Sequence, residues 1–498
     1  MLKYSIMKKQ IIYLSVILAF VIFSGVIISK HEIWRDEGRA WLIAQSAESI
    51  PELFKALKYD GTPALWYLTL YPFAKAGLPV LTMSIMHFLI IFAAVLIFLK
   101  FSPFSLLEKT LFIFGYFILY EYNAIARSYA FTVLLLFVIA AFYGQRFKKT
   151  VQYFILLSVL SASNLHSMCI SIALVIFYFF ESKPGTFNTK HKWAVLIFSA
   201  TLLFSIYQLF PPSDLTRTLT GWKGSKASTI PNAFVSAFLP VQIPQLNFWN
   251  TKIIYYPDNV RAFWGIPLFL LSLAVFIRKP KAMALYGLTS LSILALFALK
   301  YGGSTRHHGL MFILFIFSLW IAQNYIEQPL FFGKRIGQLF SKKAINVVFL
   351  TILGLQVLAA PIPLYYDYKY DFSAGKKAAD YLKENNLLSG DTFICVYDFF
   401  TSEAILPYTD VSFYSLENSK SGRFIVFNTG CDKVFDTTIK YKTDIINTVT
   451  GGKKYNKILF ILNSENNDEN FLKEYTLIKY FHNTIVRDES YYIYLKHG

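Results

Sequence analysis

The sequence predicts a polytopic α-helical membrane protein with a small α/β domain at its C-terminal end. Hydrophobic residues make up 55% of the 498 residues and aromatic residues 18%. Charged residues make up only 16%, whereas a soluble domain carries roughly 25%. A string of apolar stretches ends near Pro363, and the rest of the chain is polar.

Eleven apolar stretches are candidates to cross a bilayer, which takes about 20 residues of helix. The first stretch lacks an A-x-A-type cleavage site, so we interpret it as a retained helix and not as a signal peptide. The third is short, and the joins around Asn123 and His166 are tight. The expected spans are 10–29, 80–100, 108–122, 126–145, 150–166, 167–182, 193–210, 262–277, 282–300, 307–323 and 344–362.

The basic residues predict the orientation of these spans. The net charge is +18, but no long basic face interleaves with aromatic residues, so we expect no nucleic-acid partner. Lys and Arg instead form short clusters between alternate spans, as the cytoplasmic loops of membrane proteins do. Eleven spans therefore predict a multi-pass protein of the plasma (inner) membrane, with a cytoplasmic N-terminus and an extracytoplasmic C-terminus.

The chain divides into a membrane domain, 1–362, and an extracytoplasmic α/β domain, 363–498. Two outward segments of the membrane domain are long. The segment 30–79 has the pattern of amphipathic helices that lie in the interface plane, and Ser49 begins one of them with a capping box. The segment 211–261 is rich in Pro, Thr and Asn and predicts a partly ordered loop.

The tail alternates helix and strand patterns, which indicates a small α/β fold. Cys395 and Cys431 lie in this tail, where a disulfide and two free thiols are both open possibilities. The expected elements are helices at 373–386 and near 433–449, and strands at 392–397, 411–416, 423–428, 458–462 and 491–495.

The adjacent carboxylates Asp36 and Glu37 follow the first span directly, in the stretch Trp34 to Trp41. An ionisable residue at a membrane surface is by default a candidate functional residue. An interfacial ion-pair network with Arg35 and Arg39 is the structural alternative. Functionally, Asp36 could take a proton from an acceptor hydroxyl. Glu37 points away from Asp36 on a regular helix, so the two do not form an acid/base pair by themselves.

Other polar residues fall on the same predicted outer face. Asp60 stands at a Gly-Thr-Pro break, where it either forms a turn or returns a second carboxylate toward Asp36. Arg127, His166 and Arg306 each lie at the outward end of a span, where snorkelling or helix capping is the alternative. Cations that converge on a carboxylate suit a phosphate leaving group, because Arg holds phosphate bidentately.

His307 follows Arg306 directly, and His308 comes next. Such a pair suggests a metal site, but adjacent side chains on one helix diverge. A divalent cation stays possible without a defined ligand set, and no other cofactor is indicated.

Four motifs resemble those of GT-C-fold glycosyltransferases. They are the Asp36-Glu37 pair, the run Asp60-Gly-Thr-Pro-Ala-Leu-Trp-Tyr67, the segment Ala126-Arg-Ser-Tyr-Ala130 and the turn Asn164-Leu-His166. The nearest branch is the bacterial relatives of the protein mannosyltransferases and lipid A aminoarabinose transferases, which are glycosyltransferase family 39-like. The resemblance covers about 1–320 and the external C-terminal domain.

The resemblance implies a polyprenyl-phosphate sugar as donor and an extracytoplasmic glycan, lipid or protein as acceptor. Asp36 matches the catalytic aspartate of the first loop, and Glu37 the neighbouring acidic position. Asp60 falls where relatives carry a charged residue before a Pro-aromatic run. Arg306 falls where relatives keep a basic residue for the donor phosphate, with Arg127, Arg39, His166 and His307 as further candidates around the substrate.

The expected activity is inverting transfer of a hexose or pentose. One alternative is an O-antigen-type polymerase or ligase, which would usually use arginine-rich outer loops and lack an α/β tail. A second is a polysaccharide or lipid transporter, which needs polar groups along a path at mid-membrane, where these spans are apolar. A third is an acyltransferase built around His166.

Overall fold

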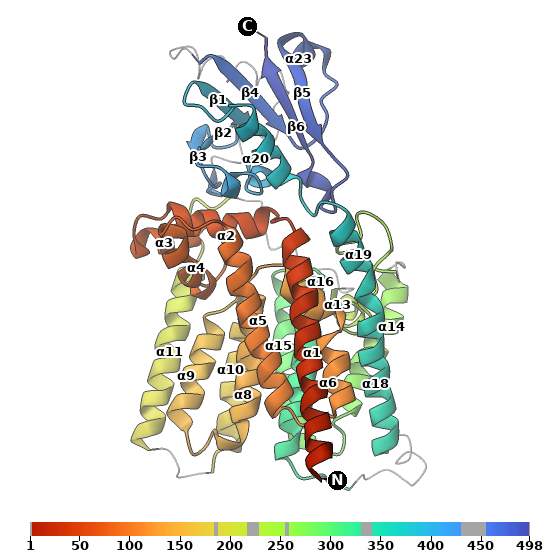
Figure 1. The fold of residues 1–498 in the computed structure, drawn as a ribbon. Coiled ribbons are helices and arrows are strands. Elements are labelled where there is room, and N and C mark those ends of the chain that lie inside the picture. The colour runs from red at the N-terminus through yellow and green to blue at the C-terminus, as the bar shows by residue number, and fades with distance from the viewer. Residues whose placement is uncertain are drawn as a thin grey trace.

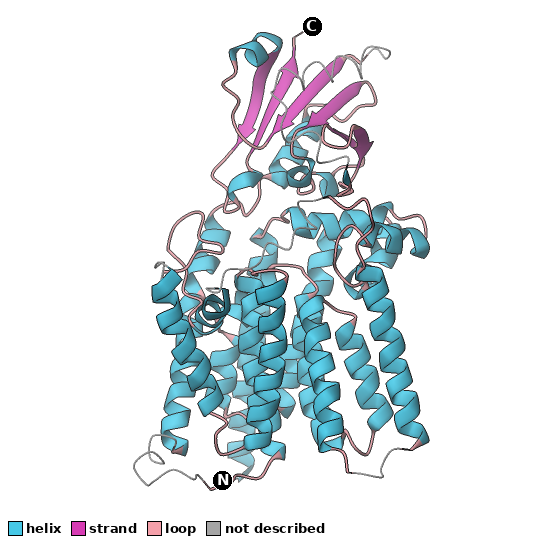
Figure 2. Ribbon diagram, turned by 180° about the vertical axis from the view of Figure 1, so that it is seen from behind, coloured by secondary structure: helices cyan, strands magenta, loops and turns pink. Residues whose placement is uncertain are grey.

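A computed structural model of the chain describes residues 2–183, 188–216, 229–253, 258–329, 341–429 and 455–497. It consists of a bundle of long helices with a β-sheet domain at one end (Figures 1 and 2). The N-terminus lies at the opposite end of the bundle from the sheet (Figure 1). This arrangement agrees with the predicted fold class, a mostly helical protein with a small C-terminal sheet domain, while the boundary at residue 362 stays a prediction.

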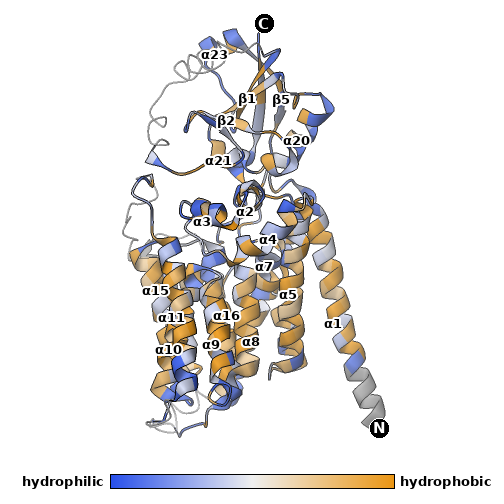
Figure 3. Ribbon diagram, turned by 90° about the vertical axis from the view of Figure 1, so that its left-hand side faces the viewer, coloured by the Kyte–Doolittle hydropathy of each residue, from blue (hydrophilic) through white to orange (hydrophobic). Residues whose placement is uncertain are grey.

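Among the described residues, six helical segments are long and apolar enough to cross a membrane, and the bundle helices are hydrophobic along most of their length (Figure 3). Shorter apolar helices stand among them, so the predicted number of eleven spans stays a prediction. The six segments are Gln10–Lys30 of helix α1 (Leu2–Lys30), helix α5 (Leu81–Phe101), helix α11 (Thr189–Leu209), helix α15 (Pro280–Leu299), Thr305–Asn324, which begins with helix α16 (Thr305–Ile321), and Lys342–Lys369, which contains α18 (Lys342–Ala359) and α19 (Pro361–Lys369).

The stretch predicted as a third span, 108–122, is not one continuous α-helix. Helix α6 (Leu106–Ile113) ends before Gly115, a π-helical turn covers Phe117–Glu121, and α7 (Tyr122–Ala124) follows. At Gly115 a Cβ would lie 2.9 Å from the Cβ of Gln356 on α18. The break therefore lets α6 and α18 approach closely, which the apolar pattern alone did not reveal.

The middle of the bundle follows the predicted order with shifted boundaries. Helix α9 ends before the predicted residue 166, because Asn164 caps the next helix by accepting a hydrogen bond from the backbone N–H of Ser167 at 3.0 Å. His166 therefore lies in the first turn of a helix and not at the end of a span. The helices concerned are α8 (Tyr129–Phe142), α9 (Thr150–Ser161) and α10 (Leu165–Glu181).

The first outward segment forms three short helices, as its amphipathic pattern predicts. They are α2 (Arg35–Ser46), α3 (Ile50–Leu57) and α4 (Leu65–Lys75). The Ser49 hydroxyl accepts from the backbone N–H of Glu52 at 3.4 Å, which is the predicted cap of α3. These helices lie across the end of the bundle, beneath the sheet domain (Figure 1).

The second outward segment contains a helix that the loop prediction missed. Helix α13 (Thr229–Phe238) is buried from Ala233 onward and packs against α14 (Asp258–Ala274) and α16. Its Pro231 lies in the first turn, where proline is tolerated. The residues 217–228 and 254–257 of this segment lie outside the described part of the chain.

The described residues of the tail form a six-stranded mixed sheet in the order β3-β2-β1-β4-β6-β5. Strand β1 pairs in parallel with β2 and β4, and the remaining neighbours are antiparallel. Helices α20 (Gly375–Glu384), α21 (Phe399–Ser402) and α23 (Glu469–Glu474) complete the described domain. The strands are β1 (Thr392–Val396), β2 (Phe413–Ser415), β3 (Lys420–Gly422), β4 (Lys457–Leu462), β5 (Tyr475–Phe481) and β6 (Tyr491–Lys496).

Most elements predicted for the tail are present, with two corrections. The predicted strand 423–428 is wrong, because the chain turns after β3 and keeps only an isolated bridge between Leu215 and Asn428. Strand β5 was not predicted, since it is a largely exposed edge strand with little apolar alternation. Cys395 is a free, buried thiol on β1. Cys431 and the predicted helix near 433–449 lie outside the described residues.

Candidate active site

Helix α2 places Asp36 at the end of the bundle that faces the sheet domain (Figure 1). The helix begins after Trp34, whose backbone N–H donates to the Glu37 carboxylate at 3.2 Å. Asp36 and Glu37 thus occupy the first turn, where negative charge interacts favourably with the helix dipole. The side chain of Asp36 is 17% exposed, which leaves it sheltered but accessible.

Two arginines from distant parts of the chain converge on Asp36. Arg306 Nη2 lies 3.1 Å from Asp36 Oδ2, and Arg127 Nη2 lies 3.9 Å from the same oxygen. Arg127 also donates from Nη1 to the backbone carbonyl of Asp36. In the described part of the chain no donor contacts Asp36 Oδ1. One carboxylate oxygen is therefore held between two guanidinium groups while the other is open.

Aromatic rings shelter the Arg306 side of this cluster. The guanidinium carbon of Arg306 lies 5.0 Å from the ring centroid of Trp34 and 5.5 Å from that of Trp249. The two indoles meet edge to face at 4.7 Å. The Tyr122 hydroxyl donates to the backbone carbonyl of Arg306 at 2.7 Å. The two rings cover one side of the guanidinium group and keep bulk water from that side, so the ion pairs gain strength from a lower local dielectric.

Glu37 points away from Asp36 and is fully buried. One of its oxygens accepts from the backbone N–H of Ala126, and the other contacts the Trp34 N–H and His31 Nε2. Glu37 thereby joins the start of α2 to the loop that carries Arg127. The geometry gives Glu37 a positioning role, while its predicted catalytic role stays a prediction.

His31 extends the Glu37 contacts to helix α19. Its Nε2 lies 3.3 Å from Glu37 and its Nδ1 lies 2.8 Å from Asp367. Burial alone would lower the pKa of His31, but the two carboxylates outweigh burial and raise it to about 10. The imidazole is therefore a cation at neutral pH and holds two buried carboxylates together.

Asp60 and Arg39 form a second buried pair beside the first. Arg39 Nε donates to Asp60 at 2.6 Å, and Tyr67 donates to the other Asp60 oxygen. Burial raises the pKa of Asp60, but the guanidinium groups of Arg39 and Arg127 have the larger combined effect and lower it. Asp60 therefore faces Arg39 and Tyr67, with the positive charge of Arg127 nearby.

Arg39 also binds the sheet domain. Its Nη1 donates to Glu403 at 3.0 Å and to the backbone carbonyl of Ile425 at 2.9 Å, and its guanidinium stacks 4.7 Å from the Phe427 ring centroid. Only 4% of Arg39 is exposed. With these protein partners Arg39 acts as a link between the two parts of the molecule, and its predicted role around the substrate stays a prediction.

His166 and His307 lie next to each other, as the shared outer face predicted. Their rings are 5.2 Å apart, and His307 also meets the ring of Tyr129 at 5.4 Å. His307 Nδ1 contacts the Ser304 hydroxyl at 2.8 Å at the start of α16. His308 turns elsewhere and contacts the Gly302 carbonyl at 2.9 Å.

The residues around Asp36 do not fit a divalent cation. Metals of the hard type take oxygen ligands, whereas the nearest side chains to Asp36 are two guanidinium groups. Among the described residues no group of three His, Cys, Asp or Glu side chains is arranged to hold a metal ion. The structure therefore supplies no ligand set for the divalent cation that the sequence left possible.

An apolar groove of about 670 Å³ ends beside Asp60. Side chains of α10, α11 and α15 form most of its walls, and Lys58 and Lys300 lie with Asp60 at its outer end. The sequence did not predict which helices would form such a groove. The apolar lining residues include Leu165, Met168, Ile206, Leu209, Leu296 and Leu299.

Sequence reasoning missed Trp249, Glu403 and Tyr122. Trp249 lies in a segment predicted as a partly ordered loop, and Glu403 lies 364 residues from Arg39. Neither residue belongs to a periodic pattern that would link it to the first loop. For Tyr122 the signal was its position next to Asn123 at a tight join, which marks a residue at the outward end of the bundle.

No family model matches the sequence, and no curated protein matches it. Among solved structures it is similar to the arabinofuranosyltransferase AftD from mycobacteria, with a TM-score of 0.45 and 10% identity. The similarity covers 97% of this chain and 40% of the AftD chain, so the chain spans about two fifths of that protein's length. At this TM-score the likeness assigns no family or activity.

Proposed function

We propose that this chain is a membrane glycosyltransferase that moves a sugar from a polyprenyl-phosphate donor to an extracytoplasmic acceptor. The observation that carries the proposal is the Asp36 carboxylate held between Arg306 and Arg127 at the end of the bundle. A base next to two phosphate-binding cations is what such a transfer requires. In this proposal the chain lies in the inner membrane with its N-terminus in the cytoplasm. Residues 1–362 form the membrane domain, and residues 363–498 form an extracytoplasmic domain.

Asp36 is the proposed general base. Its open Oδ1 takes the proton of the acceptor hydroxyl as the hydroxyl oxygen forms a bond to the anomeric carbon. The bond from that carbon to the phosphate oxygen breaks in the same displacement, which inverts the anomer. The transition state has oxocarbenium character, as in glycoside hydrolysis by inversion.

Arg306 and Arg127 are the proposed ligands of the leaving phosphate. The polyprenyl phosphate departs as an anion, so it needs fixed positive charge and not a proton. Both guanidinium groups are already positioned by contacts with Asp36, which reduces the reorganisation needed during the reaction. When donor binds, phosphate oxygens share these guanidinium groups with Asp36.

The groove beside Asp60 is the proposed site for the donor's lipid chain. Its apolar walls suit an isoprenoid chain, since burial of apolar surface is favourable at about 25 cal/mol per Å². Lys58 and Lys300 lie at its outer end, where a phosphate would emerge. Asp60 and Arg127 then connect this end of the groove to Asp36.

The test offers the protein a panel of polyprenyl-phosphate hexoses and pentoses together with acceptors in membrane fractions. The measured quantity is the polyprenyl phosphate that the transfer releases. Asp36→Asn keeps size and hydrogen bonding but removes the base, so we expect turnover to fall about 10²–10⁴-fold while donor binding persists. Glu48→Gln is the matched control, because Glu48 is an exposed carboxylate of the same segment. Full turnover by Asp36→Asn would refute the assignment of the base. Transfer from sugar diphosphates alone would refute the donor class.

A further inference from the structure

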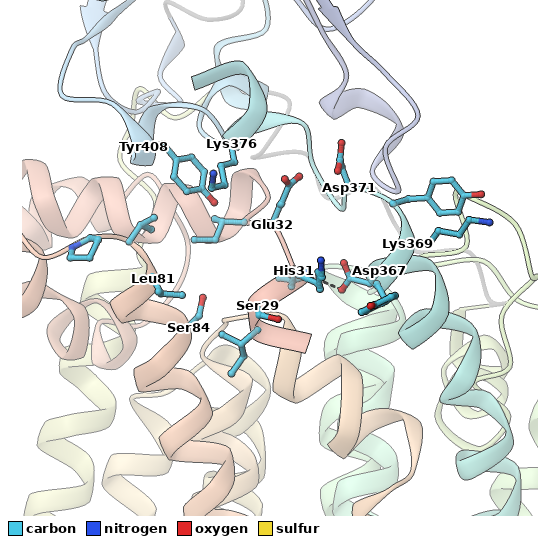
Figure 4. Close-up of a pocket in the computed structure, with 17 residues that line it drawn as sticks. Ser29, His31, Glu32, Leu81, Ser84, Asp367, Lys369, Asp371, Lys376 and Tyr408 are labelled. Carbon is cyan, nitrogen blue, oxygen red and sulfur yellow. Dashed lines mark hydrogen bonds and ion pairs between the residues drawn. The ribbon is translucent and has the colours of Figure 1, made fainter. Parts of the chain in front are cut away.

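A cavity of about 610 Å³ lies where four helices meet (Figure 4). Its walls are the C-terminal end of α1, the N-terminal end of α5, the C-terminal end of α19 and Lys376 of α20. His31, Glu32 and Asp367 line it together with lysine and tyrosine side chains. The cavity lies at the level where α1 leaves the bundle, below the sheet domain (Figure 4). The transfer reaction proposed above uses none of its open volume.

An apolar slot of about 160 Å³ continues from this cavity along α1. Lys30, Asp367 and Tyr368 line both spaces, so the polar cavity and the slot are adjacent and share one wall. Phe23 and Val26 line the slot and are 47% and 44% exposed on a helix that is apolar enough to span a membrane. The slot therefore opens on a face that lipid chains contact.

Two residues that line the cavity each have a buried carboxyl oxygen without a hydrogen-bond donor among the described residues. The oxygens are Asp367 Oδ1 and Glu32 Oε2. Asp367 is only 4% exposed, and its other oxygen is occupied by His31 at 2.8 Å and Tyr120 at 3.0 Å. A buried acceptor without a partner is costly, and each such case calls for an explanation. A ligand that brings donors into the cavity supplies the missing partners.

Charges of both signs line the cavity, which favours an uncharged ligand head. The basic side chains are Lys30, His31, Lys369 and Lys376, and the acidic ones are Glu32, Asp367 and Asp371. His31 pairs with Asp367, and Lys376 pairs with Asp380 at 2.6 Å. Asp371 pairs with Lys377 at 2.6 Å. Hydroxyl groups satisfy such a mixed lining, because each can donate to a carboxylate and accept from a lysine. An anionic or cationic head would meet charges of its own sign.

We propose that this cavity and slot bind a membrane glycolipid, or another uncharged lipid with a polyhydroxyl head. The lipid chain occupies the slot on α1, and head-group hydroxyls donate to Glu32 and Asp367. The site is separate from Asp36 and does not depend on the proposed glycosyl transfer. Its test is therefore a binding measurement.

The probe is octyl β-glucoside below its micelle concentration, titrated by calorimetry into the full chain held in a detergent without a sugar head. Octyl phosphocholine tests the head group, and free glucose tests the need for the chain. We expect the glucoside to bind and both comparison compounds to bind at least tenfold more weakly. If octyl phosphocholine binds as tightly as the glucoside, the assignment of an uncharged head group is wrong. If free glucose binds as tightly, the ligand needs no alkyl chain and is not a lipid.

Two variants locate the binding. Burial raises the pKa of Glu32 to about 8, so its carboxyl is mostly uncharged at neutral pH. Glu32→Ala removes this acceptor and should weaken glucoside binding about two- to tenfold, as for a lost hydrogen bond between uncharged groups. Val26→Trp fills the slot and should weaken it as well. Ile22→Trp is the matched control, because Ile22 is 56% exposed on α1 and does not line the slot. If Glu32→Ala and Val26→Trp fold and bind like wild type, the proposal is wrong.

Discussion

Arg306 Nη2 and Asp36 Oδ2 lie 3.1 Å apart although 270 residues separate them in the chain. Arg306 stands in the first turn of α16, and Asp36 in the first turn of α2. The two helices therefore bring their first turns together, with Trp34 and Trp249 beside the pair. Because both side chains are mostly buried, solvent screens the attraction between them less than in a surface ion pair, and desolvation of the two charges offsets part of that attraction.

Replacement of Arg306 should weaken binding of the donor phosphate. Arg306→Lys keeps the charge but loses the bidentate fork, and Arg306→Ala also leaves Asp36 with less compensation. We expect the affinity for polyprenyl phosphate without its sugar to fall about ten- to a hundredfold in the alanine variant. The affinity of the lysine variant should lie between those of wild type and the alanine variant. Arg487→Ala, an exposed arginine of the sheet domain, is the control. If all these proteins bind polyprenyl phosphate alike, the phosphate site must be sought at Arg127.

Much of the membrane part could be predicted because apolar stretches and basic clusters are local signals. The sequence placed Asp36, Arg127, His166 and Arg306 on one face, and the structure brings Asp36 into contact with both arginines. The two contacts arise because residues at the same end of the helix bundle share one surface, whatever their distance in the chain.

The remaining features depend on tertiary contacts that leave no local pattern. The Arg39–Glu403 pair joins the first loop to the tail, and neither residue indicates the other. Helix α13 was missed because Pro231 and Asn232 interrupt its apolar run. The π-helical turn at Phe117–Glu121 could not be predicted, because its residues belong to a continuous apolar stretch. A π-helical turn and an α-helix can have the same amino-acid composition.

The predicted orientation can be tested with phosphatase fusions. A fusion to the C-terminus should be active in the periplasm of a bacterial host, because the sheet domain lies at the opposite end of the bundle from the N-terminus (Figure 1). Fusions after Lys148 and after Lys183 should be inactive, since both residues follow spans that are predicted to end in the cytoplasm. Activity in the opposite pattern would reverse the orientation and place Asp36 inside the cell.

Gly38 allows α2 to contact the sheet domain. A Cβ at this position would lie 1.9 Å from the backbone carbonyl oxygen of Glu403. Gly38→Ala should therefore push α2 away from α21 and destabilise the protein by about 1–3 kcal/mol, as overpacking does. Gly25→Ala on α1 is the control, because nothing lies within 4 Å of its Cβ position. The measurement is the thermal unfolding midpoint in detergent, and equal midpoints for the two variants would contradict a close contact at Gly38.

His31 should make stability depend on pH in a defined window. Its pKa is raised from 6.5 to about 10 in the folded chain, because Asp367 and Glu37 outweigh burial. Between these two values the folded chain holds a proton that the unfolded chain has lost, so stability falls as pH rises. The contribution of His31 is fully present below about pH 6.5 and is lost as pH rises through about 10.

The measurement compares unfolding midpoints of wild type and His31→Gln across this range. Subtraction of the two curves removes the effect of other titrating groups. The advantage of wild type should be largest near pH 6.5 and should shrink toward pH 10, because the neutral imidazole no longer compensates two buried carboxylates. A constant difference over the whole range would show that His31 contributes through packing against Phe372, 4.4 Å away, and not through its charge.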